Sequence, residues 1–332
     1  MNIRFYHRTQ SKLNRSIERV FSSVEKELSC LSVEVENVYA RPYRFWPLGM
    51  IANMISMGWD ARKKKGINHV VGDIHYCTLL MPASRTVLTV HDLVVLHSKD
   101  VSNIFREFVR LLWYYLPLRK LKHITCVSET TKEDLIRQFP FAEKKISVIP
   151  NPVGTEFRRF PLPHNTVPVI LHIGTRENKN LPRVIEALKG TMCHLRIIGK
   201  LSERDKNRLI HSGIDYSNAE GLSDSEIVEE YKNCDIVSFP SIFEGFGMPI
   251  IEAQTVGRPV LTSNIEPMKS VCGGAAMMVD PYDTNSIRAG FMSIINDSSL
   301  RDKLITAGHN NSLNYSANVI AKKYKQVYEN IN

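Results

Sequence analysis

The sequence lacks any long hydrophobic run, and no segment approaches the roughly 18 apolar residues that a membrane-spanning helix requires. The most apolar stretch, residues 111–118, is too short for that purpose. Residues 1–6 have no apolar core of the signal-peptide kind and are predicted to form a first strand. We therefore expect a cytoplasmic protein.

Paired cysteines are also missing. The six cysteines are widely spaced, and the sequence contains neither a Cys-x-x-Cys motif nor histidine pairs at metal-binding spacing. This pattern argues against a disulfide framework or a zinc site and predicts buried, reduced thiols. No Gly-x-Gly-x-x-Gly follows a predicted strand, so a dinucleotide-dependent oxidoreductase is not expected.

Basic residues are concentrated in the first half of the chain. Residues 1–160 carry 25 Lys and Arg against 15 Asp and Glu, whereas residues 161–332 carry 18 against 19. A basic surface can bind nucleic acid, anionic lipid or a phosphorylated substrate. No nucleic-acid-binding motif accompanies the charge, so nucleic acid is not an expected partner.

Strands and helices alternate through both halves, which predicts an α/β protein with parallel, doubly wound sheets. A Pro-rich stretch over residues 150–168 separates the halves and predicts a linker. We expect a first domain over residues 1–160 and a second over residues 161–313, with a terminal helix over 314–332. The expected strands are 3–6, 32–39, 69–74, 86–90, 124–127, 146–149, 169–173, 194–198, 235–240 and 259–262. The expected helices are 14–29, 103–121, 130–139, 181–188, 203–212, 225–233, 249–257, 285–296, 298–310 and 317–330.

The most informative stretch is residues 240–253, in which Glu244 and Glu252 are separated by seven residues. It follows an apolar strand, contains Gly245 and Gly247, and has Pro249 where a helix tolerates proline in its first turn. First-turn amides attract a phosphate or a sugar hydroxyl, and glycines let a ligand approach the backbone closely. We expect Glu252 in that first turn. Taken singly, each glutamate could equally be a helix-start residue.

This stretch resembles the signature of the retaining glycosyltransferases of family four, in which Gly-Phe-Gly-(Leu/Met)-Pro lies between the two glutamates. The resemblance extends over nearly the whole chain and is strongest over residues 169–282. It implies a GT-B fold, in which two Rossmann-like domains face a central cleft that binds a nucleotide-sugar. It also implies that the terminal helix packs back on the first domain.

The resemblance implies roles for residues of both domains. The residues expected to take part in catalysis are Glu244, His91 and Lys179. Those expected to bind the donor are Gly174, Arg176, Lys179, Lys200, Leu222, Gly245, Phe246, Gly247, Met248 and Glu252. Of these, Glu244 would contact sugar hydroxyls, Glu252 the ribose, and His91 the sugar.

The sequence departs from the family pattern in two places. The family usually has Arg-Lys before the helix that begins near residue 181, whereas this chain has Asn178 before Lys179. Arg176 is a candidate for the missing charge. The first loop commonly carries a Gly-Gly pair, but residues 8–19 contain no glycine, so Arg8, Lys12 or Arg15 could replace it or the loop could face the acceptor.

Two further surfaces are predicted. Asp73, His75 and Tyr76 follow a first-domain strand and are candidates for acceptor binding, although they could equally be structural. Aromatics beside clustered cations over residues 41–65 and 113–122 favour contact with an anionic membrane. The alternative is a solvated basic face over core aromatics.

The sequence thus predicts a retaining, metal-independent hexosyltransferase that acts on a lipid-linked or growing glycan. No Asp-x-Asp motif is present to bind a divalent cation, and no cofactor is expected beyond the nucleotide-sugar itself. GDP-mannose is the favoured donor, and a UDP-hexose is a nearly equal alternative. A sugar-nucleotide epimerase and an inactive sugar-nucleotide-binding module of the same fold remain as alternatives.

Overall fold

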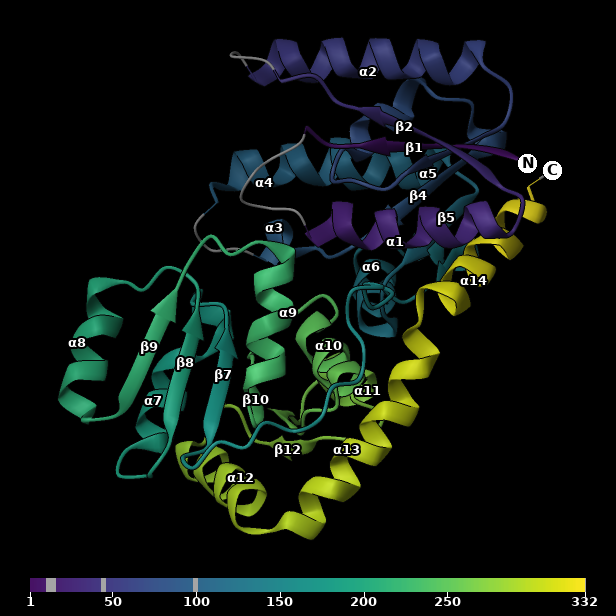
Figure 1. Ribbon diagram of the computed structural model, residues 1–332. Helices are drawn as coiled ribbons and strands as arrows, with labels where there is room; N and C mark the ends of the chain where they lie inside the picture. The colour runs from purple at the N-terminus through teal and green to yellow at the C-terminus, as the bar shows by residue number, and fades with distance from the viewer. Residues whose placement is uncertain (10–15, 43–45, 98–100, 332) are drawn as a thin grey trace. The chain divides into compact units, whose positions relative to one another are not determined.

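The computed structural model describes residues 1–9, 16–42, 46–97 and 101–331. These residues divide into two compact units, one formed by Met1–Pro152 with Ala317–Asn332 and the other by Val153–Ser316. Each unit has its own sheet and its own apolar core. Figure 1 shows the course of the chain through both units.

The first unit is built on a six-stranded parallel sheet with the strand order β2-β1-β3-β4-β5-β6. The order reverses between β1 and β3, which pair in parallel. The strands are β1 (Asn2–His7), β2 (Glu34–Tyr39), β3 (Ile67–Val70), β4 (Thr86–Val90), β5 (His123–Cys126) and β6 (Ile146–Val148). Every residue of β3 and β4 is buried, as expected for central strands of a parallel sheet.

Helices connect these strands. They are α1 (Ser16–Cys30), α2 (Trp46–Lys63), α3 (Val94–His97), α4 (Asn103–Val109), α5 (Leu116–Lys120) and α6 (Glu129–Gln138), with a π-helical segment η3 (Arg110–Tyr115) joining α4 to α5. Short 3₁₀ turns are η1 (His75–Leu80), η2 (Ala83–Arg85) and η4 (Pro140–Lys145). Ser128 caps α6 by accepting from the Thr131 amide.

The last helix, α14 (Ala317–Glu329), belongs to the first unit although it ends the chain. It packs against α1, and the Tyr328 hydroxyl lies 2.7 Å from His69 Nδ1 of β3. The Tyr324 ring contacts the rings of Phe21 and His69. The carboxyl-terminal segment therefore completes the core of a unit that begins at residue 1.

The second unit carries a six-stranded parallel sheet with the order β12-β11-β10-β7-β8-β9. Its strands are β7 (Val169–Ile173), β8 (His194–Ile198), β9 (Asp215–Ala219), β10 (Ile236–Phe239), β11 (Val260–Ser263) and β12 (Met277–Val279). Figure 1 shows β7, β8 and β9 running side by side. From β7 the chain adds β8 and then β9 outward, and it returns to the other side of β7 with β10, which is the Rossmann order.

The helices of this unit alternate with its strands. They are η5 (Glu177–Lys179), α7 (Leu181–Leu188), α8 (Glu203–Ser212), α9 (Asp224–Asn233), α10 (Met248–Val256), α11 (Met268–Val271), α12 (Thr284–Asn296), α13 (Ser298–Ser312) and η6 (Leu313–Tyr315). α7 packs against α12, and α10 packs against α13. Ser223 and Glu226 form a reciprocal capping box at the start of α9.

The structure differs from the sequence expectation in a few elements. The helix α2 and the strands β9 and β12 were not predicted, and β3 ends at Val70 instead of continuing to residue 74. Hydrogen bonds from the Val71 and Gly72 amides to the Tyr6 carbonyl begin the turn that ends β3.

Five of the six cysteines are buried, whereas Cys30 is exposed, and none forms a disulfide. Among the described residues, no helix has both the length and the apolar character needed to cross a bilayer.

Candidate active site

The candidate site of the second unit lies where its strand order reverses, between β7 and β10. These two strands pair in parallel, so the loops after them leave the same edge of the sheet side by side. Ligands of open α/β sheets bind at this position. The loop after β7 holds Gly174, Arg176 and Lys179, and the loop after β10 holds Glu244 to Gly247. The sequence predicted both loops as parts of one site.

Hydrogen bonds join the two loops. The Ile242 amide donates to the Asn178 carbonyl at 2.9 Å, and the Asn178 side-chain amide donates to the Phe243 carbonyl at 2.9 Å. The same side-chain nitrogen lies 3.2 Å from Glu244 Oε1. Asn178 therefore occupies the family's arginine position with a neutral group that connects one loop to the other.

Lys179 and Glu244 form an ion pair at this junction. Lys179 Nζ donates to Glu244 Oε1 at 2.5 Å, and the two side chains are 20% and 14% exposed. The Lys179 ammonium also lies 4.8 Å from the centre of the Phe239 ring at the end of β10. The aromatic face and the carboxylate thus hold the cation at the sheet edge.

Gly174 makes room for the lysine. Its φ of +94° is in the region that side chains rarely adopt, and a Cβ there would lie 2.8 Å from Lys179 Cγ. The next turn ends at Asn180, which has φ of +66° and donates to the carbonyls of Pro240 and Pro281 at 2.9 and 2.7 Å. The buried Asn180 therefore orients the start of α7.

The helix α10 begins directly after the glycine loop. Gly247 adopts φ of +113° at its N-cap, and Pro249 lies in the first turn as predicted. Phe246 is buried and its ring contacts the Tyr315 ring, so its side chain is part of the core. Only its backbone is therefore available to contact a nucleotide-sugar. The amides of the first turn carry partial positive charge and suit an anion.

Glu252 is the fifth residue of α10, so our prediction that it lies in the first turn is wrong by about one residue. Its side chain is buried, and its Oε2 accepts a hydrogen bond from the Tyr231 hydroxyl at 2.6 Å. Tyr231 belongs to α9 and is fully buried. The carboxylate is thus held in a fixed orientation by a residue that the sequence did not single out.

His172 lies beneath the two loops, in β7. It is buried, and its Nδ1 lies 3.2 Å from Ser238 Oγ of β10. Burial, followed by the positive charge of Lys179, lowers the pKa of His172 to about 4. A neutral imidazole therefore lies under the lysine at physiological pH. Its position within an apolar strand offered no signal beyond that of a core residue.

The remaining donor-side candidates lie on nearby loops. Arg176 is exposed at the N-cap of η5. Lys200 is exposed after β8, and its carbonyl accepts from the Thr175 hydroxyl at 2.6 Å, which brings this loop beside the loop after β7. Leu222 is half-buried just before α9.

His91 follows β4 in the first unit. Its Nε2 lies 2.9 Å from the Val71 carbonyl, and because a carbonyl can only accept, Nε2 carries the proton. Burial lowers the pKa of His91, so the ring is neutral near pH 7. Val71 follows β3 at the reversal of strand order in this unit, which places His91 beside that reversal.

The three acceptor candidates differ in exposure. Asp73 is exposed, whereas His75 and Tyr76 are buried in η1. His75 Nδ1 bonds to the Trp113 carbonyl at 2.9 Å, and the Tyr76 ring packs against the Trp113 ring. Asp73 alone of the three presents its side chain to solvent. Of the first-loop candidates, Lys12 and Arg15 lie outside the described residues, and Arg8 pairs with Glu18 at 2.8 Å.

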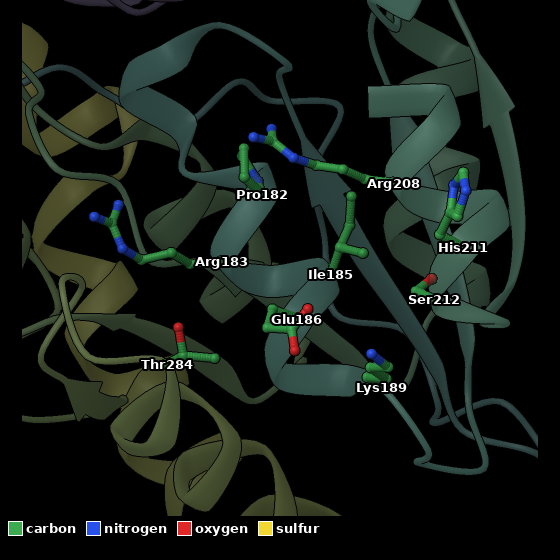
Figure 2. A pocket seen from close by; sticks show the side chains of 9 residues that line it. All are labelled: Pro182, Arg183, Ile185, Glu186, Lys189, Arg208, His211, Ser212 and Thr284. Carbon is green, nitrogen blue, oxygen red and sulfur yellow. The ribbon is translucent and has the colours of Figure 1, made fainter. Parts of the chain in front are cut away.

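The described residues contain no metal-binding cluster, and one cavity of this unit is lined by other residues. No group of three or more His, Cys, Asp or Glu with metal-binding geometry occurs within the described ranges. A cavity of about 540 Å³ lies between α7 and α8 and is lined by none of the predicted residues. Figure 2 shows that its basic side chains, among them Arg183 and Arg208, do not point toward one another.

Comparison with known proteins identifies the class. Residues 154–311 match the family model "Glycosyl transferases group 1", and residues 33–157 match "Glycosyltransferase Family 4". The chain therefore belongs to the glycosyltransferases of family four.

Curated relatives are similar at low identity. The chain is 25% identical over 298 residues to the O-antigen chain mannosyltransferase RfbU of Salmonella typhimurium, covering 83% of this chain and 80% of that protein. It is 25% identical over 255 residues to O-antigen chain mannosyltransferase B of Escherichia coli, covering 66% of this chain and 63% of the relative. The match to the E. coli serotype-specific mannosyltransferase WbdA spans 68% of this chain and only 32% of that longer protein.

Solved structures show the same fold. Anabaena HepE, crystallised with UDP and glucose, matches with a TM-score of 0.79 over 99% of this chain and all of that chain, at 16% identity. WaaG, a glycosyltransferase involved in lipopolysaccharide biosynthesis, matches with a TM-score of 0.74 over 99% of each chain, at 12% identity. The predicted GT-B fold class is confirmed.

Proposed function

We propose that this glycosyltransferase moves a hexose from a nucleoside diphosphate sugar to a hydroxyl group of a glycan, with retention at the anomeric carbon and without a metal ion. The observation that carries the proposal is the junction of the two loops, where Lys179, Asn178 and Glu244 meet beside the first turn of α10. A cation and a helix N-terminus suit the diphosphate, and a carboxylate suits sugar hydroxyls.

In the proposed reaction, the bond between the anomeric carbon and the diphosphate oxygen breaks as the acceptor oxygen approaches from the same face. The new bond forms between the anomeric carbon and the acceptor oxygen, and the acceptor proton goes to the leaving diphosphate. Lys179 and the α10 amides stabilise the negative charge that develops on that diphosphate. No protein side chain needs to act as the base, in contrast to hydrolases with two flanking carboxylates.

The other predicted residues keep supporting roles in this proposal. Glu252 binds the ribose, and Gly245 to Met248 contribute backbone groups to the sugar and phosphates. Lys200, Leu222 and Arg176 lie toward the nucleotide. His91, neutral near pH 7, hydrogen-bonds a sugar hydroxyl.

We propose GDP-mannose as the donor and a lipid-linked or growing glycan as the acceptor, with Asp73 on the acceptor side. The mannosyltransferase names of the curated relatives favour mannose. A UDP-hexose is the alternative, because HepE of the same fold has been crystallised with UDP-glucose.

The experiment that tests the proposal is a panel of nucleotide-sugars measured first by thermal shift and then by slow donor hydrolysis with and without EDTA. We expect one donor to stabilise the protein and to be hydrolysed equally well in EDTA. Glu244→Gln should abolish hydrolysis, whereas Glu177→Gln, an exposed residue of the neighbouring turn, should not. Release of an altered sugar-nucleotide without hydrolysis would indicate an epimerase, and binding without turnover of donor and acceptor would indicate an inactive binding module.

A further inference from the structure

The helix α2 (Trp46–Lys63) is apolar on two opposite faces. Its inner face packs on η1 and contributes the buried residues Met57 and Ala61, and Gly58 lies so close that a Cβ would be 2.5 Å from Leu80 Cβ. Its outer face exposes Leu48 (62% exposed), Ile51 (44%), Ile55 (55%) and Trp59 (63%). The core of the unit accounts for the first face only.

The four exposed side chains form a continuous stripe. Their spacings of three, four and four residues put them on one side of an α-helix. Single exposed apolar residues are normal on a protein surface, but a contiguous apolar patch marks an interaction site. We call these four residues the outer stripe.

A basic cluster continues the outer stripe at the carboxyl end of α2. Arg62, Lys63, Lys64 and Lys65 are all exposed. Lys63 Nζ lies 4.7 Å from the centre of the Trp59 ring, and Lys64 pairs with Glu36 and Asp60. Arg62 and Lys65 enter no salt bridge with any residue that the structure describes. The stripe therefore ends in an indole with positive charge around it.

We propose that the outer stripe and the basic cluster bind the surface of an anionic lipid bilayer, with α2 lying in the plane of the interface. A helix of this kind buries its apolar side chains at the boundary between headgroups and acyl chains, and its lysines reach the phosphates. The tryptophan is suited to that boundary because its ring is apolar and its N–H is polar.

Charge favours a bilayer over a second copy of this chain. The first 160 residues carry a net charge of +10, and two such surfaces would repel each other. A convex helix with cations at one end also matches a broad anionic surface better than a narrow groove. Each cation held near such a surface strengthens binding by roughly fivefold.

This proposal does not rest on the glycosyl transfer reaction, since vesicle binding is measured without donor or acceptor. The full chain is mixed with vesicles of phosphatidylglycerol and phosphatidylcholine (30:70) or of phosphatidylcholine alone, and bound protein is separated by flotation. We expect binding to the anionic vesicles only, and a loss of that binding at high salt.

Two double variants, each with a control, separate the contribution of the outer stripe to vesicle binding from that of the basic cluster. Ile55→Ser with Trp59→Ser should lower binding by tenfold or more, whereas Met192→Ser, an 81% exposed residue of the second unit, should leave it unchanged. Arg62→Gln with Lys65→Gln should lower binding roughly 30-fold. Lys322→Gln with Lys323→Gln, which removes two exposed cations from α14, should have a far smaller effect. Circular dichroism and melting temperature verify that each variant folds.

Tryptophan emission locates the contact. We expect a blue shift on addition of anionic vesicles, and loss of most of that shift in Trp59→Phe, which keeps an apolar ring on the stripe. Equal binding by the wild type and the Ile55→Ser, Trp59→Ser variant would overturn the proposal, as would equal binding to neutral and anionic vesicles. A lipid-free dimer that the same double variant abolishes would assign the stripe to a second copy instead.

Discussion

Lys179 Nζ lies 2.5 Å from Glu244 Oε1, which joins the loop after β7 to the loop after β10. Two of the residues that the sequence predicted for catalysis therefore neutralise each other's charge. An anionic diphosphate would compete with Glu244 for the lysine. In the proposed reaction, donor binding would then release the carboxylate toward the sugar and so link phosphate recognition to the positioning of Glu244.

Removal of the lysine should weaken binding of the nucleoside diphosphate. Charge-assisted hydrogen bonds contribute about 1.5–3 kcal/mol, so Lys179→Ala should raise the Kd by roughly 10- to 150-fold. Lys189→Ala, at an exposed position just after α7, is the matched control and should leave the Kd unchanged. Isothermal titration calorimetry with GDP and UDP measures both. Equal affinities of the two variants would remove Lys179 from the donor site.

Asn178 should act on turnover more than on binding. It holds Glu244 and the Phe243 carbonyl but brings no charge to a diphosphate. Asn178→Ala should therefore lower kcat about tenfold, the loss of roughly one hydrogen bond, while the Kd for the nucleoside diphosphate changes less than twofold. The control is Glu177→Ala on the same turn. A large rise in Kd with an unchanged kcat would show that Asn178 contacts the donor instead.

Tyr231 offers a test of the role of Glu252. Tyr231→Phe keeps the buried ring and removes the hydroxyl that donates to Glu252 Oε2. If Glu252 binds the ribose, the variant should lose up to tenfold in nucleotide affinity, and it should discriminate less between a ribonucleotide and its 2′,3′-dideoxy analogue than the wild type does. Unchanged discrimination would assign the Tyr231–Glu252 pair to the stability of α9 and α10 alone.

Much of the second unit was predictable from the sequence because residues that end helices and strands occur at the boundaries of its elements. The strand β7, the helices α7 and α8 and the strand β8 match the predicted ranges, since Gly, Pro and Asn occur at their boundaries. The strand β9 was missed because Asp215–Ala219 is polar and half exposed at the sheet edge. Periodicity detects only strands with a buried face.

The helix α2 was missed for a different reason. Apolar side chains occupy both its inner and its outer face, so the sequence shows no single apolar stripe. Only the fold reveals which of them are unpartnered.

The supporting contacts of the site were beyond the sequence altogether. The Tyr231 hydroxyl of α9 donates a hydrogen bond to Glu252 of α10. The guanidinium of the buried Arg258 donates to the carbonyls of Tyr231 and Pro161. The Glu-x₇-Glu spacing specifies the two carboxylates but carries no information on what orients them.

The buried His172 should make the second unit less stable in acid. Its pKa is lowered to about 4 in the folded protein, whereas an unfolded histidine titrates near 6.5, so the unfolded state binds the proton first. The stabilising contribution is complete above pH 6.5 and is lost as the pH falls toward 4. Between pH 7 and pH 5 the loss amounts to about 2 kcal/mol.

The measurement for His172 is peptide-resolved hydrogen exchange in β7 and β10 at pH 7 and pH 5, corrected for intrinsic exchange. His172→Asn retains a polar group near Ser238. Between pH 7 and pH 5, this variant should lose about 2 kcal/mol less of its free energy of unfolding than the wild type does. His194→Asn is the control, since His194 lies at the surface and pairs with Asp215. The same pH dependence in wild type and His172→Asn would mean that other groups govern the acid sensitivity.

Gly174, in the loop after β7, and Gly190, just after α7, provide a matched pair of variants. Both have positive φ, +94° and +70°, so a side chain at either position strains the backbone by about 1 kcal/mol. A Cβ at Gly190 meets nothing within 4 Å, whereas at Gly174 it would lie 2.8 Å from Lys179 Cγ and force the lysine to move. Gly190→Ala should therefore lower the melting temperature by a few degrees and leave kcat/KM unchanged. Gly174→Ala should lower kcat/KM at least tenfold, with a Kd for the nucleoside diphosphate that rises as in Lys179→Ala. If both variants lose stability but keep their kcat/KM, Gly174 is not required for the position of Lys179.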